Sequence, residues 1–217
     1  MTIETAMIFA AGFGTRMGGL TATQPKPMLH LAGRPMIDHS IELLRAAGIR
    51  NIFANTHYLP DELETHLNAL GVKTLREYPI LETGGGLRAA LPWIGPQPVI
   101  TMNPDAAWDG PNPVEELLSC WKPEMTALLL LTESADPDGD FDLKDGTIRR
   151  VGPYKYTGLE VVSTNRLDEV EETVFSLNLY WDLLMKTGPL HGVPYSGSWT
   201  DIGTRDALEA VNLRMAE

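Results

Sequence analysis

The sequence predicts a single α/β domain over residues 1–217, with a mostly parallel, Rossmann-like central sheet, helices on both faces and antiparallel additions in the last third. Up to Leu131, short apolar runs alternate with helical patterns. Strands that alternate with helices in this way form parallel sheets covered on both faces. After Leu131 turn signals replace this spacing, and Asp145-Gly146 between two short runs is typical of a β-hairpin. No repeat, linker or low-complexity tract divides the chain.

The elements of the first part follow one another in strand–helix order. The apolar run 6–11 opens into a glycine loop, as a buried strand does. Ile37, Ile41 and Leu44 then recur at helical spacing, and Gly48 ends that helix. The further elements expected are strands at 49–55, 72–77, 99–102 and 125–131 and helices at 60–70, 86–91 and 113–121.

The last third is expected to be built differently. The segment 136–140 (DPDGD) has the composition of a turn. The hairpin around Asp145-Gly146 follows it, and the run 156–163 is expected to be another strand. Helices are expected at 176–185 and 204–215.

The chain is acidic, with 29 Asp and Glu residues against 17 Lys and Arg and a formal net charge of −12 at pH 7. A nucleic acid or an anionic membrane needs clustered cations, so the charge argues against both as partners. Cys120 is the single cysteine, which excludes an intramolecular disulfide and a cysteine-built zinc site. The N-terminal run lacks the basic residues of a signal peptide, and the apolar stretches are far shorter than the ~20 residues of a membrane helix. We therefore expect a soluble, cytoplasmic protein.

A glycine-rich loop at 12–19 (GFGTRMGG) follows the first expected strand, where phosphate-binding loops occur. It fits neither the dinucleotide fingerprint, which needs glycine at Met17, nor the P-loop, which needs lysine at Leu20. Taken alone it could equally be a tight turn with solvated charges. The first 34 residues nevertheless hold three cations and one acid, namely Arg16, Lys26, Arg34 and Glu4. Such a cluster in an acidic chain favours a site for an anion.

The sequence around this loop resembles the signature of the sugar-1-phosphate nucleotidyltransferases. The segments that carry the resemblance are 10–17 (AAGFGTRM), 25–29 (PKPML), 32–37 (AGRPMI), 55–59 (NTHYL), 82–86 (ETGGG) and 199–204 (WTDIGT). They span nearly the whole chain. The resemblance implies the nucleotide-diphospho-sugar transferase fold and an enzyme that joins a nucleoside triphosphate to a sugar 1-phosphate and releases pyrophosphate.

The resemblance also implies roles for individual residues. Arg16 would hold the β- and γ-phosphates, and Lys26, fixed between two prolines, would contact the α-phosphate. The remaining nucleotide-binding residues it implies are Ala11, Gly12, Gly14 and Thr15 in the loop, with Glu82, Gly85 and Gly86 around the base. The attacking phosphate oxygen is ionised near neutral pH, so the reaction needs no general base.

A divalent metal, Mg²⁺, is the cofactor that the resemblance implies, with Asp105 and Asp201 as its carboxylate ligands. Oxygen ligands are those that Mg²⁺ prefers, although Asp105 could be a turn residue and Asp201 a helix cap. Relatives usually have glycine where Pro104 stands, and proline removes an N–H and forbids a positive φ. The turn that presents Asp105 is therefore expected to differ from theirs.

The acceptor side is expected to be lined by residues from the last third of the chain. By resemblance these are Phe141, Tyr156, Gly158 and Asn178, although the aromatic pair could equally be core. The substrates implied are UTP and N-acetylmuramate 1-phosphate, with a monomer or small homo-oligomer as the assembly. Open alternatives are glucose or mannose 1-phosphate with dTTP, UTP or GTP, a cytidylyl- or molybdopterin-type transferase, and a catalytically silent protein that binds nucleotide-sugars.

Overall fold

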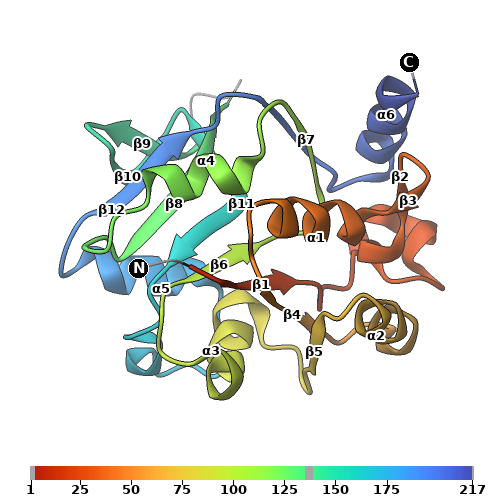
Figure 1. The fold of residues 1–217 in the computed structure, drawn as a ribbon, viewed down its shortest axis with the longest axis horizontal. Helices are drawn as coiled ribbons and strands as arrows, with labels where there is room; N and C mark the ends of the chain where they lie inside the picture. Colours follow the sequence, from red (N-terminus) through yellow and green to blue (C-terminus); the bar gives the residue numbers. More distant parts are fainter. Residues whose placement is uncertain (1–2, 135–138, 217) are drawn as a thin grey trace.

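A computed structural model describes residues 3–134 and 139–216. The expected turn at 136–140 falls largely outside these residues. Within them, the strand–helix succession of the first part is confirmed (Figure 1). The elements are β1 (Thr5–Phe9), α1 (Met36–Ala46), β4 (Asn51–Thr56), α2 (Pro60–Ala69), β5 (Lys73–Arg76), α3 (Glu82–Ile94), β6 (Val99–Met102), α4 (Pro113–Cys120) and β8 (Ala127–Glu133).

The last third contains the expected hairpin and helices. Strands β9 (Gly139–Lys144) and β10 (Thr147–Gly152) pair antiparallel around Asp145-Gly146. The long strand β11 (Tyr154–Val162) and the helices α5 (Leu177–Met185) and α6 (Arg205–Met215) also occupy the expected places. Short elements that the sequence did not predict are η1 (Thr15–Thr21), η2 (Lys26–Met28), β2 (His30–Leu31), β3 (Arg34–Pro35), β7 (Ala106–Asp109), η3 (Leu167–Glu169), β12 (Leu190–Pro194) and β13 (Ser198–Asp201).

Nine of the described strands form one sheet in the order β5-β4-β1-β6-β11-β8-β12-β10-β9. Strands β5, β4, β1 and β6 are mutually parallel. Strand β11 inserts antiparallel between β6 and β8, and β12 is parallel to β8. Strand β8 therefore does not extend the parallel block directly, because the later strand β11 separates it from β6.

Helices cover both faces of the sheet. Alternate residues of β1 show this, since Ala6 and Ile8 pack in one core with α1, α2 and α4. Met7 packs in a second core with α3 and α5. The predicted apolar face of α1 is buried as expected, with Ile37, Ile41 and Leu44 at most 2% exposed. In the described residues, no helix is both long and apolar enough to cross a membrane.

A two-stranded sheet joins parts of the chain that are distant in sequence. Strand β7 pairs antiparallel with β13, which places Asp201 opposite Ala106. The backbone N–H of Ile202 also donates to the carbonyl of Asp105 over 2.8 Å. The two expected metal carboxylates are thereby brought to one place. Helix α6 packs beside β2 at the same end of the molecule (Figure 1).

Candidate active site

A cleft opens at the carboxyl ends of β1 and β6, where parallel-sheet sites gather. Three cavities make up this cleft, and Phe9 at the end of β1 lines all three. The glycine-loop cavity, of about 210 Å³, is lined by Gly12, Gly14, Thr15, Arg16, Lys26, Pro104 and Asp105, among others. The α3 cavity, of about 370 Å³, includes Ala11, Gly12, Asn55, Ile80, Glu82 and Asp105. The aromatic cavity, of about 210 Å³, includes Asn103, Phe141, Tyr156, Asn178 and Trp181.

The glycine loop folds tightly over Lys26. Gly14 adopts a left-handed backbone conformation with φ of +64°, which residues other than glycine rarely adopt. A Cβ built on Gly14 would lie 2.9 Å from Cβ of Lys26 and 3.0 Å from Cγ2 of Thr21. The hydroxyl of Thr21 donates to the carbonyl of Gly14 over 3.1 Å. Glycine is thus needed here both for the turn and for the close approach of Lys26.

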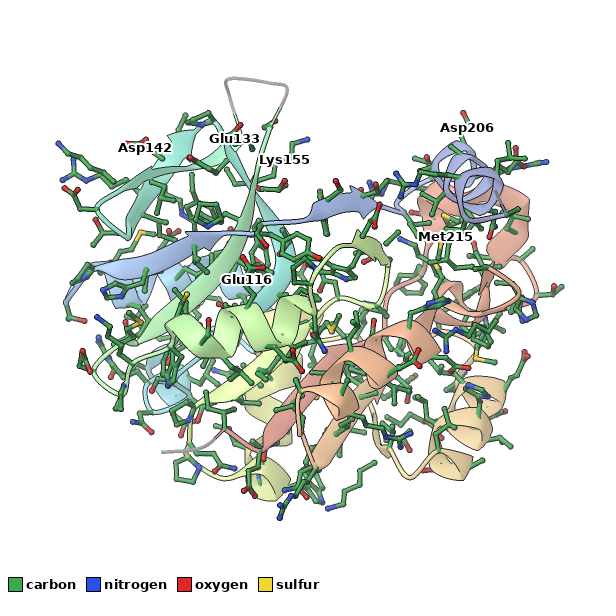
Figure 2. The ribbon with its side chains drawn as sticks, turned by 45° about the horizontal axis from the view of Figure 1, so that its top comes forward. Glu116, Glu133, Asp142, Lys155, Asp206 and Met215 are labelled. Atoms are coloured by element: carbon green, nitrogen blue, oxygen red, sulfur yellow. The ribbon has the colours of Figure 1, made fainter. Side chains whose placement is uncertain are left out.

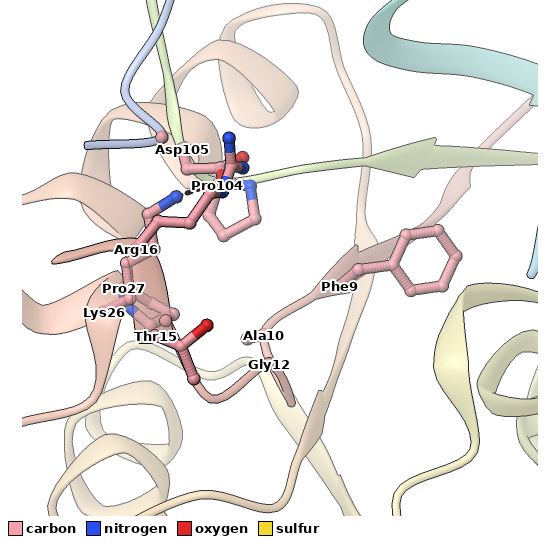
Figure 3. A pocket seen from close by; sticks show the side chains of 11 residues that line it. Phe9, Ala10, Gly12, Thr15, Arg16, Lys26, Pro27, Pro104 and Asp105 are labelled. Carbon is pink, nitrogen blue, oxygen red and sulfur yellow. Dashed lines mark hydrogen bonds and ion pairs between the residues drawn. The ribbon is translucent and has the colours of Figure 1, made fainter. Parts of the chain in front are cut away.

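Lys26 and Asp105 form an ion pair inside the glycine-loop cavity (Figure 3). The ammonium of Lys26 donates to Oδ2 of Asp105, with 12% and 25% of the two side chains exposed. Pro104 is buried and lines the same cavity. The carboxylate of Asp105 thus lines the cleft even though proline, not glycine, precedes it.

Arg16 and Asp201 complete this end of the cleft. Nη1 of Arg16 lies 3.8 Å from Oδ2 of Asp201, and the Arg16 side chain is 67% exposed. Burial raises the pKa of Asp201, and the nearby Asp105 carboxylate raises it further. The cations Lys26, Arg16 and Lys155 act in the opposite direction. The mutual repulsion of the two carboxylates is what a bound cation would relieve.

The donor set at Asp105 and Asp201 fits a hard divalent cation only in part. Both supply carboxylate oxygens, which Mg²⁺ prefers, usually from one or two protein groups together with phosphates and waters. Among residues 3–134 and 139–216, no group of three or more His, Cys, Asp or Glu side chains is arranged to hold a metal. The site is thus suited to a metal that arrives with phosphate oxygens.

The segment ETGGG forms the first turn of α3, so this helix begins four residues earlier than the expected helix at 86–91 and is longer than expected. Helix α3 starts at Glu82, and Glu82 lines the α3 cavity. Gly85 and Gly86 are buried inside the helix. A Cβ at Gly86 would lie 2.5 Å from Oε1 of Glu77 and 2.8 Å from Nδ2 of Asn55. A Cβ at Gly85 would meet the Thr173 carbonyl at 2.6 Å. The close approaches at these glycines are therefore made by the protein's own chain.

The expected acceptor residues meet at the aromatic cavity, with one exception. Phe141, Tyr156 and Asn178 line it. Gly158 does not line it; this residue has a φ of +84° and lies where the pairing of β11 with β8 changes register, between Tyr156 and Glu160. A Cβ there would lie 2.8 Å from Cβ of Asn103, whose backbone N–H donates to the Gly158 carbonyl. Gly158 thus positions Asn103, which lines both the aromatic and the α3 cavities.

Other cleft residues were not singled out from the sequence. Asn55 accepts from the backbone N–H of Ala10 over 2.8 Å and donates to Glu77 over 2.7 Å. Glu77 in turn accepts from the N–H of Leu81, just before α3. This chain of hydrogen bonds ties the glycine loop to the start of α3. The position of Asn55 within segment 55–59 was the available signal.

Charge is distributed unevenly over the molecule. In Figure 2, Glu133, Asp142 and Lys155 lie together at the end of the sheet that carries the hairpin, far from Asp206 on α6. Between residues 133 and 172 the sequence has eleven carboxylates against five Lys and Arg. This segment therefore carries an excess of six carboxylates over cations, whereas the glycine-loop cavity contains Arg16 and Lys26.

A reaction between two phosphorylated substrates needs backbone amides and cations at the phosphates and a cation-binding pair of carboxylates beside them. At the carboxyl ends of β1 and β6 the cleft brings the glycine loop, Arg16 and Lys26 together with the carboxylate of Asp105. Together with the mixed nine-stranded sheet, it defines the class as a nucleotidyltransferase with the nucleotide-diphospho-sugar transferase fold.

The chain belongs to the MobA-like NTP transferase domain family, which it matches over residues 6–139. It is 32% identical to the N-acetylmuramate alpha-1-phosphate uridylyltransferase of Caulobacter vibrioides, over 99% of this chain and 98% of that protein. It is 34% identical to the enzyme of the same name from Neisseria meningitidis serogroup B, over 92% and 93%. Within its family the chain thus belongs to the sugar-1-phosphate nucleotidyltransferases.

A solved structure shows the same fold. HddC from Yersinia pseudotuberculosis, in complex with GMP-PN, superposes with a TM-score of 0.80 over 98% of this chain and 99% of that chain. The two sequences are 21% identical. The expected fold class is therefore confirmed.

Proposed function

We propose that this protein transfers a uridylyl group from UTP to N-acetylmuramate 1-phosphate, with Mg²⁺ as cofactor, and releases UDP-N-acetylmuramate and pyrophosphate. The observation that carries the proposal is the similarity along nearly the whole chain to two uridylyltransferases of that sugar phosphate. The paired charges in the cleft support it. The enzyme would act in the cytoplasm, in the recycling of cell-wall sugars, as a monomer or small homo-oligomer.

In this reaction an oxygen of the acceptor phosphate attacks the α-phosphorus of UTP. The bond from that phosphorus to the bridging oxygen breaks, and pyrophosphate leaves with the electron pair. The attacking oxygen is already ionised, so the protein's contribution is alignment and charge stabilisation. Gly12, Gly14 and Thr15 line the cavity beside Arg16 and Lys26, where their backbone amides would meet the triphosphate.

Lys26 and Arg16 would contact different phosphates of the triphosphate. Lys26 lies inside the cleft, held by Asp105, so its charge is in place before substrate binds and needs little reorganisation. It would stabilise charge at the α-phosphate. Arg16 is largely exposed and can close over the β- and γ-phosphates, where it would stabilise the departing pyrophosphate by bidentate hydrogen bonds.

Asp105 and Asp201 would hold Mg²⁺ through their carboxylate oxygens. When bound, the metal supplies positive charge that neutralises neighbouring phosphates and helps the leaving group depart. Its remaining ligands would be phosphate oxygens and water, because the two aspartates supply only part of its coordination.

The two other cavities would receive the rest of each substrate. The α3 cavity would hold the nucleoside, with Ala11 and Glu82 on its wall and Gly85 and Gly86 behind it in α3. The aromatic cavity would hold the sugar, with Phe141, Tyr156 and Asn178 on its wall. Since Phe9 lines both cavities and the glycine-loop cavity, the reacting phosphates would meet beside it.

The test is a pyrophosphate-release assay of purified protein with Mg²⁺. Five nucleoside triphosphates (UTP, dTTP, CTP, GTP and ATP) are crossed with the 1-phosphates of N-acetylmuramate, glucose and mannose. We expect the highest kcat/KM for UTP with N-acetylmuramate 1-phosphate. A higher value for another pair would overturn the substrate assignment, and no release from any pair would overturn the enzymatic function.

A further inference from the structure

A carboxyl group lies fully buried behind the aromatic cavity. Glu160, in the middle of β11, is 0% exposed and has the apolar neighbours Leu159 and Val161. Those two side chains pack on the opposite face of the sheet, in the core with α1 and α4. Glu160 therefore points toward the face that carries α3 and α5. An acid in a buried apolar strand is costly unless hydrogen bonds satisfy it.

The carboxyl group of Glu160 accepts hydrogen bonds from α5 and β6 and has a third polar neighbour on β11. Its Oε2 accepts from Nε1 of Trp181 on α5 over 2.9 Å. Its Oε1 accepts from the hydroxyl of Thr101 over 3.2 Å, which lies directly opposite in β6. The Tyr156 phenol, near the beginning of β11, is close enough to Glu160 for each group to influence the pKa of the other. No ion pair to Glu160 occurs among the residues that the structure describes.

Two of these partners form the wall of the aromatic cavity. Tyr156 and Trp181 both line it, and their rings meet edge to face with centroids 5.0 Å apart. Phe141 adds a further edge-on contact to Trp181 at 5.8 Å. The guanidinium of Arg150 lies 5.1 Å from the Phe141 ring centroid and 5.3 Å from that of Trp181.

Arg150 is itself held in place outside this wall. It donates to Oδ1 of Asn178 over 2.8 Å and pairs with Asp182. The aromatic rings are thus fixed from the outer side by Arg150 and from the core by Glu160. Rings held by hydrogen bonds at their polar ends have few orientations left, which is what a selective binding wall requires.

We propose that Glu160 is a positioning residue of the acceptor subsite: its buried carboxyl holds Trp181 and Tyr156 in the orientation that the acceptor sugar contacts. This inference rests on the proposed function only for the identity of the ligand in the aromatic cavity. Glu160 does not line the cavity, so it acts through the two rings. Loss of the hydrogen bond to Glu160 frees the indole to turn, and the phenol of Tyr156 loses the ring against which it packs. The acceptor then loses the shaped wall of its cavity, while the triphosphate keeps its own contacts.

The test compares Michaelis constants for the two substrates in Glu160→Leu and Glu160→Gln. Leucine leaves the Trp181 N–H unpaired, and we expect KM for the acceptor to rise about tenfold while KM for the triphosphate changes less than about twofold. The amide oxygen of glutamine still accepts from Trp181, so Glu160→Gln is expected to restore the acceptor KM to within about threefold of wild type. The exposed Glu124→Leu is the matched control.

A second variant keeps the test decisive if Glu160→Leu does not fold. Trp181→Phe keeps an aromatic ring but removes the N–H donor, so it should raise the acceptor KM in the same way. Where Glu160→Leu folds, combining it with Trp181→Phe should add little to the rise in the acceptor KM, because both changes remove the same hydrogen bond.

The outcomes separate this inference from the proposed function. An unchanged acceptor KM in Trp181→Phe and in any folded Glu160→Leu would overturn the positioning role while the enzyme remains active. An equal rise in both Michaelis constants would also overturn it. No turnover by wild type with any substrate pair would instead overturn the proposed function.

Discussion

Lys26 and Asp105, which are 79 residues apart in the sequence, form a largely buried ion pair across the glycine-loop cavity. Lys26 stands between prolines ahead of β2, and Asp105 follows the buried strand β6. Neither partner can be removed without leaving the other charge uncompensated in a partly desolvated place. The ion pair therefore determines both where the Lys26 ammonium lies in the cavity and how its charge is balanced.

Replacement of Lys26 tests whether its charge contributes to turnover. We expect Lys26→Ala to lower kcat by roughly two to four orders of magnitude, because a charge in place for the transition state is lost. Lys26→Arg should rescue little, since a planar guanidinium does not reproduce a compact ammonium. Pyrophosphate release measures both. Lys73→Ala, at an exposed position, is the control, and wild-type turnover in Lys26→Ala would remove this residue from the site.

Metal removal should stop the reaction without unfolding the protein. Asp105 and Asp201 lie among elements tied together by backbone hydrogen bonds, so the fold does not depend on a cation there. We expect EDTA to abolish turnover, excess Mg²⁺ to restore it, and the melting temperature to change little. Asp201→Asn should raise the Mg²⁺ concentration needed for half-maximal rate. Full activity in EDTA would show that the carboxylates have another role.

Gly14→Ala should damage both stability and nucleotide binding. The φ of +64° and the 2.9 Å approach to Cβ of Lys26 leave no room for a methyl group. We expect a loss of roughly 1–3 kcal/mol in the free energy of unfolding, together with a raised KM for the triphosphate. Urea denaturation and steady-state kinetics measure the two effects. Gly19→Ala is the control, because a Cβ there meets nothing within 4 Å.

The buried carboxyl of Glu160 predicts a pH dependence of stability. Burial raises the pKa of Glu160 from 4.5 to about 8, against the opposing effect of its hydrogen bonds to Trp181, Thr101 and Tyr156. The folded state therefore retains a proton that the unfolded state has lost between these two values. Stability is then greatest below about pH 4.5, as far as this group is concerned, and falls as the pH rises toward 8.

Comparison with Glu160→Gln isolates that contribution, because the amide does not titrate. We expect the free energy of unfolding of wild type, relative to the variant, to fall by roughly 4 kcal/mol at most between pH 4.5 and 8. Denaturation at a series of pH values measures the difference. A difference that stays constant, or that rises with pH, would contradict a raised pKa at Glu160.

Much of the fold was predictable from local patterns. The apolar face of α1 and the strand at 99–102 follow from side-chain periodicity and from flanking glycine and proline, which act within a few residues. Helix α3 was only half predicted, because the glycines from Gly84 onward have low helix propensity. Packing against Phe175, Glu77 and Asn55 accounts for them, and those contacts are not local in sequence.

The candidate site, like the fold, was predictable from the sequence only in part. Arg16 and Lys26 were singled out from the glycine loop and the clustered charge, and Asp105 from the resemblance; the structure brings all three to one cavity. Strands β7 and β13 were not predicted because each pairs with the other, about 90 residues away in the sequence, and neither belongs to the central sheet. Glu160 was not singled out either, because its role depends on its hydrogen bonds to Trp181 and Thr101, which the sequence does not reveal.

The sequence by itself determined the strand–helix order, the glycine loop with its cations and the family, because these are encoded in contiguous residues. Tertiary structure alone decided that β11 inserts between β6 and β8 and that Asp201 lies beside Asp105. It also decided that Tyr156 and Trp181 share a buried carboxyl. The physical reason is that strand pairing and burial join residues far apart in the chain, and the free energy of those contacts is set by the assembled molecule.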